Sequence, residues 1–158
     1  MNKWKYMITG GIIGGSVSTY ICSKAIKSDH ERMESMVDRL DSYYHLLVQW
    51  MRNKYNGWNI SDYFSDKEYR KIAIYGMGEI GDLLYNDLKE AGISVEYSID
   101  QVGGSYIKEL PGYTLRDELP EVDAIIITPI FAIEDIMNSL RRVTSAQLIS
   151  VQEIIYNG

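Results

Sequence analysis

The chain contains little cysteine, histidine or proline, with one Cys, two His and three Pro among its 158 residues. Its only cysteine, Cys22, excludes an internal disulfide framework. His30 and His45 cannot join Cys22 at any recognised metal-ligand spacing. The sequence therefore predicts no structural metal site.

Basic residues are scarce outside the amino-terminal segment. The net charge of the chain is −6, but residues 1–32 contain five Lys or Arg against Asp29 and Glu31 and so carry +3. The remainder carries −9, and a body this acidic repels a phosphate backbone. Nucleic-acid binding through a basic surface is therefore excluded.

The basic residues flank an uncharged segment of 17 residues, Tyr6 to Cys22. At about 1.5 Å per helical residue this segment is just long enough to cross a thin membrane. Gly10, Gly14 and Ser18 recur every four residues, a stripe that favours close packing of helices in lipid. A cleaved signal peptide is the alternative, but no Ala-x-Ala-like site closes the run, which favours a retained anchor.

A linking helix is predicted from Asp29 to Tyr55, ending at Asn56-Gly57, with Asn59, Ser61 and Asp62 as turn and cap formers beyond it. Its apolar seam favours either a short coiled coil or a face that packs on the following domain. The seam consists of Met33, Met36, Leu40, Tyr43, Leu47, Trp50 and Lys54, and it is widened by Val37, Tyr44, Met51 and Trp58. The predicted divisions are residues 1–28 (membrane anchor), 29–57 (amphipathic helix) and 58–158 (one domain).

From residue 71 onward, strand and helix patterns alternate. Strands are predicted at residues 71–76, 93–100, 124–128 and 148–151, with helices at 79–91 and 133–140. A short extra strand is expected at 105–110 or 113–115, followed by a helical turn at 116–119. Such alternation indicates an α/β fold, a Rossmann-like doubly wound and mostly parallel sheet of about five strands.

The first strand ends in the pattern G-x-G-x-x-G, formed by Gly76, Gly78 and Gly81. In this position Gly76 permits a tight turn, Gly78 leaves room for a pyrophosphate, and Gly81 lets helix and strand pack closely. The amino terminus of the helix then faces the phosphates. Asp100, at the end of the second strand, is placed to accept hydrogen bonds from ribose hydroxyls, which favours NAD over NADP.

Thr128 follows a later strand at the same edge of the sheet and precedes Pro129, which turns the chain away sharply. Packing of Phe131 in the core is favoured over a role as a cofactor wall. The predicted ligand-binding residues are Gly76, Met77, Gly78, Glu79, Ile80, Gly81, Asp100 and Thr128. The alternatives are a glycine turn kept only for packing and an Asp100 that simply faces solvent; a Glu79 side chain pointing inward would repel a phosphate.

No catalytic set is found. Both histidines precede the sheet, so no Ser-His-Asp triad can form there. The pattern Tyr-x-x-x-Lys occurs at Tyr20/Lys24, Tyr63/Lys67 and Tyr85/Lys89, but none of the three is placed like the pair of a short-chain dehydrogenase. No catalytic residue is assigned.

The stretch "YRKIAIYGMGEIGDLLYNDLKEAGISVEYSID", Tyr69 to Asp100, resembles the Rossmann-like nucleotide-binding domains of bacterial surface-polysaccharide biosynthesis proteins. The resemblance implies NAD or a UDP-sugar at Gly76, Gly78, Gly81 and Asp100. "MNKWKYMITGGIIGG" with its helical linker is similar to small anchored proteins of capsule or exopolysaccharide loci. The chain lacks the catalytic second half of the enzymes.

These features predict a membrane-anchored dinucleotide- or nucleotide-sugar-binding module, accessory or regulatory in polysaccharide synthesis. The anchor implies a single-pass protein of the cell membrane with its carboxyl-terminal domain in the cytoplasm, where nucleotides are. Expected partners are the nucleotide, the membrane through residues 6–22, polysaccharide-synthesis proteins and a second copy through the anchor and linking helix. The alternatives are a subunit of an NAD-dependent oxidoreductase or epimerase acting on nucleotide sugars, and a non-binding structural protein.

Overall fold

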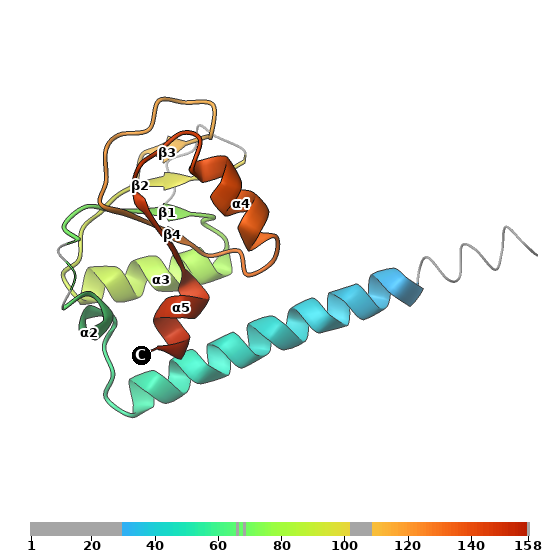
Figure 1. Cartoon of the computed structure of the whole chain (residues 1–158). Helices are drawn as coiled ribbons and strands as arrows, with labels where there is room; N and C mark the ends of the chain where they lie inside the picture. Colours follow the sequence, from blue (N-terminus) through green and yellow to red (C-terminus); the bar gives the residue numbers. More distant parts are fainter. Residues whose placement is uncertain (1–29, 66, 68, 102–108, 158) are drawn as a thin grey trace, which may run out of the picture. The chain divides into compact units, whose positions relative to one another are not determined.

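The computed structural model describes residues 30–65, 67, 69–101 and 109–157 (Figure 1). The chain divides into two units, residues 1–41 and residues 42–158. The predicted anchor and residues 105–108 of the possible strand at 105–110 lie outside the described residues. Within the described residues, no helix is both long enough and apolar enough to cross a membrane.

The second unit is built on five short strands. They are β1 (Ile72–Tyr75), β2 (Val95–Ile99), β3 (Gly112–Tyr113), β4 (Ala124–Ile127) and β5 (Gln147–Ser150). All pair in parallel, in the order β3-β2-β1-β4-β5. The predicted α/β class with a parallel sheet is thus confirmed, and this strand order is compatible with a Rossmann-like arrangement.

Four labelled helices accompany the sheet: α2 (Ile60–Phe64), α3 (Glu79–Glu90), α4 (Ile133–Leu140) and α5 (Val151–Tyr156). Residues 30–55 are also helical, and the chain turns at Asn56 and Gly57 as predicted. The predicted cap former Asn59 caps α2: its side chain accepts from the Ser61 N–H, while the Asp62 side chain accepts from the Asn59 N–H.

The two faces of the sheet are both buried. Ile72 and Ile74 of β1 face a core that α2, α3, α5 and residues 42–55 complete, while Ala73 and Tyr75 face a second core closed by α4. Figure 1 shows α3 and α5 on one side of the strands and α4 on the other. Strands buried on both faces explain the apolar runs in the sequence.

Within the second unit, residues 42–55 pack on the domain that follows them. Leu46 and Trp50 are buried in the first core, and the Trp50 indole N–H donates to Asp87 Oδ2 of α3 over 2.8 Å. Lys54 Nζ lies 2.6 Å from the other carboxylate oxygen of Asp87. The Asn53 side chain donates to the Ile155 carbonyl of α5 over 2.6 Å. For residues 42–55, the second of the two interpretations is therefore confirmed: this face of the helix packs on the following domain.

Two predictions about short elements are wrong: the end of the last strand and the helical turn at residues 116–119. Val151 was expected to end the last strand, but it begins α5, because the Ser150 hydroxyl caps a helix there by accepting from the Gln152 N–H. Residues 116–119 form no helical turn; instead, the Asp117 carboxylate closes a tight turn by accepting from the Thr114 N–H and hydroxyl. In both places a single polar side chain decides the local conformation.

Candidate functional site

The turn after β1 requires glycine at Gly76. Its φ of +87° lies in the left-handed region, which favours glycine. A Cβ at this position would lie 2.8 Å from Pro129 Cδ and 2.9 Å from Thr128 Oγ1. The Gly76 N–H donates to the Ile99 carbonyl over 2.9 Å, which holds the turn beside the end of β2.

Gly81 allows the first turn of α3 to approach this turn closely. A Cβ on Gly81 would lie 2.3 Å from the Gly76 carbonyl oxygen, well inside van der Waals contact. Gly81 itself is buried. The fold alone therefore explains the first and third glycines of the motif. For these two positions, the alternative of a glycine turn kept only for packing is sufficient.

Gly78 differs from the other two glycines because nothing in the fold requires it. It precedes α3 as the N-cap, with an ordinary φ of −76° and no side-chain hydrogen bond capping the helix. A Cβ built on Gly78 would meet no atom of the described residues within 4 Å, and Gly78 is exposed. The amino terminus of α3 thus opens onto free space at the one motif position where a ligand would need it.

Thr128 closes the turn from the β4 side. Only 3% of the residue is exposed, and its hydroxyl donates to the Gly76 carbonyl and lies 3.1 Å from the Tyr75 carbonyl oxygen. The hydroxyl therefore fixes the turn. Phe131 packs against the first core and stacks edge-on with Tyr43, with 5.7 Å between ring centroids, as favoured from the sequence.

The other predicted residues of the turn, Met77, Glu79 and Ile80, differ in burial. Met77 and Ile80 are 9% exposed and belong to the first core, so their side chains support the turn from beneath. Glu79 is exposed in the first turn of α3. A phosphate at this turn would contact the free backbone N–H groups that open α3, those of Glu79 and Ile80.

Asp100 lies beside the turn, because β1 and β2 are paired and Tyr75 is opposite Ile99. Its Oδ1 accepts from the Gln101 N–H over 2.6 Å, and its own N–H donates to the Tyr113 carbonyl over 2.9 Å. Asp100 borders a pocket of about 420 Å³. The other lining residues are Tyr75, Gln101, Thr114, Leu115 and Arg116.

This pocket contains groups of several kinds. Burial raises the pKa of the Tyr75 phenol, so it remains a neutral hydroxyl near pH 7. Asp100 and Arg116 contribute charges of opposite sign, and Leu115 contributes an apolar surface. Such a lining suits a polar, partly flat molecule held by a few hydrogen bonds. Thr114 and Arg116 were not predicted, because β3, which they follow, is only two residues long and gives no periodic signal. Tyr75 was not predicted because it ends the apolar run of β1.

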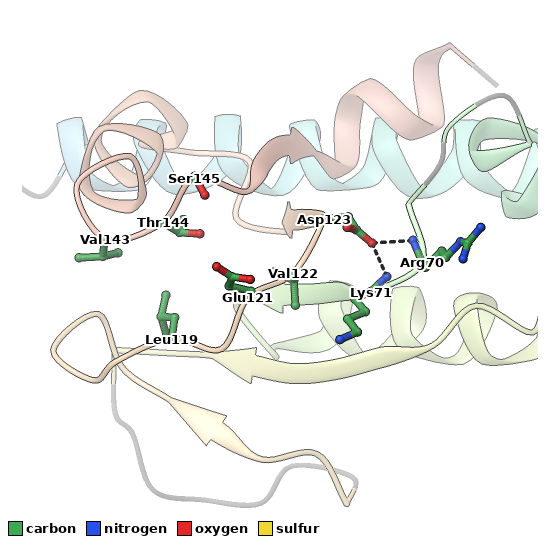
Figure 2. Close-up of a pocket in the computed structure, with 9 residues that line it drawn as sticks. All are labelled: Arg70, Lys71, Leu119, Glu121, Val122, Asp123, Val143, Thr144 and Ser145. Atoms are coloured by element: carbon green, nitrogen blue, oxygen red, sulfur yellow. Dashed lines mark hydrogen bonds between the residues drawn. The ribbon is translucent and has the colours of Figure 1, made fainter.

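A second pocket, of about 550 Å³, lies at the amino-terminal ends of the strands, where β1, β4 and β5 begin (Figure 2). Asp123 Oδ2 accepts from the Arg70 N–H over 2.7 Å and the Lys71 N–H over 2.8 Å. The hydrogen bond to Lys71, followed by that to Arg70, lowers the pKa of Asp123. Asp123 therefore ties the entry of β4 to that of β1, a structural role. Ligands of open parallel sheets bind at the carboxyl ends instead.

Two of the Tyr-x-x-x-Lys pairs lie among the described residues, and both make local contacts. Lys67 Nζ lies 3.6 Å from the Tyr63 ring centroid, and the Tyr63 hydroxyl donates to Glu153 over 2.7 Å. Lys89 Nζ lies 5.9 Å from the Tyr85 ring centroid. Within the described part of the chain, no group of three or more His, Cys, Asp or Glu residues is arranged to hold a metal ion.

No protein-family model matches the chain, and no curated protein is significantly similar to it.

Proposed function

We propose that this chain is a membrane-anchored module that binds a dinucleotide or a nucleotide sugar at the glycine turn. The observation that carries the proposal is the contrast among the three glycines. Gly76 and Gly81 are needed to form the turn, whereas Gly78 is needed by nothing in the fold and lies at the exposed, uncapped start of α3. A diphosphate at this position would receive backbone N–H groups and the positive end of the helix dipole.

The pocket beside Asp100 supplies the second half of the proposed site. It lies at the end of β2, next to the turn, and it holds a carboxylate, two hydroxyls and an apolar side chain. Asp100 would accept from ribose hydroxyls, which favours NAD or a UDP-sugar over NADP. Binding without a reaction fits a chain in which no catalytic set was identified.

The resemblance of residues 69–100 to domains of surface-polysaccharide biosynthesis supports an accessory or regulatory role in that process. With residues 6–22 as the anchor, the domain would face the cytoplasm and report nucleotide levels to synthesis proteins at the cell membrane.

The test is a calorimetric titration of the full chain in mild detergent with NAD, NADP, UDP-glucose and coenzyme A. We expect NAD or UDP-glucose to bind and Gly78→Val to abolish that binding while the protein stays folded, since the added side chain points into open space. The melting temperature should fall only by a few degrees, because valine is a poorer N-cap than glycine. Ser94→Val, an exposed substitution outside the proposed site, is the control and should bind like the wild type. No heat with any of the four ligands at millimolar concentration would leave a structural role.

A further inference from the structure

Among the described residues of the second unit, the helix of residues 42–55 has one face that no other segment covers. Leu46 and Trp50 are 0% and 4% exposed, whereas Tyr44, Met51 and Tyr55 are 62%, 65% and 92% exposed. These three side chains border an apolar groove of about 560 Å³, lined also by Leu47, Val48, Arg52 and Asn56. An apolar hollow of this kind on a helix surface marks a binding surface for another helix.

Residues 30–41, taken by themselves, also expose apolar side chains along a helix. Met33, Met36, Val37 and Leu40 are all between 58% and 67% exposed. Of the ten large hydrophobic side chains exposed among the described residues, seven lie between residues 33 and 55. This concentration separates the helix from an ordinary surface, on which exposed apolar residues are scattered singly.

We propose that two copies of this chain pair through this helix, with residues 33–40 of each copy lying antiparallel in the groove of the other. The spacing supports this pairing. Met33, Val37 and Leu40 are separated by four and then three residues, and Met51, Leu47 and Tyr44 show the same spacing when read in the opposite direction. Each position of the first set therefore meets an apolar position of the second.

The charges favour the same partner and direction. Residues 30–41 contain four carboxylates and two arginines, a net charge of −2, whereas residues 42–55 contain Arg52 and Lys54 and no carboxylate, a net charge of +2. Arg52 lines the groove, and Lys54 pairs with Asp87. Because Lys54 is already paired, antiparallel pairing brings the acidic half of one helix against Arg52 of the other. It also closes by a two-fold axis, so that the same surface is used on both copies.

The pairing is independent of the proposed nucleotide site, and disulfide trapping tests it. In the full chain, with Cys22→Ser to remove the native thiol, Met33→Cys and Met51→Cys are introduced singly and together. The antiparallel pair predicts an oxidised dimer from the double variant and little from either single variant, because residue 33 then faces residue 51 of the other copy. A cross-link between two copies gives a species of twice the chain's mass, so a denaturing, non-reducing gel separates it from any bridge within one copy.

The control is a second pair of exposed apolar positions off the helix, Leu83→Cys with Val143→Cys, which should give only the background from random collisions. Adding Leu40→Glu to the double variant should abolish its cross-link, because a carboxylate would enter the apolar contact. Cross-linking of the single variants as strong as that of the double variant would show a parallel pair. That result, or no cross-link above the control, would overturn the proposal.

Discussion

An alanine at Gly81 would place a methyl carbon 2.3 Å from the Gly76 carbonyl oxygen. Because that oxygen belongs to the backbone of the turn, the contact can be relieved only by moving α3 away from β1. We expect Gly81→Ala to lower the free energy of unfolding by about 1–3 kcal/mol. Urea denaturation of both proteins measures this loss. A variant as stable as the wild type would contradict the close approach.

The hydrogen bonds to Asp123 lead us to expect that the stability of the fold depends on pH. Hydrogen bonds from the Lys71 and Arg70 N–H groups hold its folded-state pKa below the ordinary value of 3.8. The carboxylate therefore stabilises the fold above that value, and the contribution is lost as the pH falls through the lowered pKa. Melting temperatures from about pH 6 to pH 2 should fall less in Asp123→Asn than in the wild type. Parallel curves would show that the carboxylate's charge does not matter.

At the scale of elements, residues 42–55 belong to the core of the domain. Leu46 is fully buried, so Leu46→Ala should cost about 2–5 kcal/mol of unfolding free energy. His45→Ala, one residue earlier on the exposed side, is the matched control and should change it by less than about 0.5 kcal/mol. Thermal or urea unfolding of the two variants compares them directly. Equal stability would mean that this helix is not part of the folded unit.

The long, periodic elements were predictable and the short ones were not. The strands at β1 and β4 are uninterrupted apolar runs, and α3 shows a clear helical spacing between the glycine turn and Gly92. The helices α2 and α5 have five and six residues, which is too short for any spacing to repeat. Their signals are single caps, Asn59 and Ser150.

The linking helix shows why a sequence seam can mislead. Its apolar residues cover most of its circumference, so spacing alone could not separate the buried face from the exposed one. Leu46, which is not part of the predicted seam, is fully buried, whereas Met51, which widens that seam, is 65% exposed. Only the positions of α3 and α5 decide which side of residues 42–55 faces the core.

At the scale of the whole molecule, the strand order determines where a ligand has access. β1 lies between β2 and β4, so the chain leaves β1 toward one side of the sheet and returns to the other side for β4. In open parallel sheets, ligands bind outside the carboxyl ends of the strands at a reversal of this kind. The glycine turn and Asp100 both lie at that edge, as the sequence order predicted.

The sequence predicted less of the proposed pocket than of the turn. Gly76, Gly81 and Asp100 are found through fixed spacing along the chain. Tyr75, Thr114 and Arg116 reach the pocket because of how β1 and β3 pair with β2, which no local spacing encodes. The packing role of Thr128 likewise follows from the pairing of β4 with β1.

The most direct test of the central claim is a nuclear magnetic resonance titration of the ¹⁵N-labelled full chain with NAD and with UDP-glucose. The account predicts that one of them shifts the amide signals of Gly78, Glu79, Ile80 and Gln101, while the signals of Arg70, Lys71 and Thr144 at the opposite edge of the sheet do not move. An unchanged Gly78 signal at saturating concentrations of both ligands would contradict it.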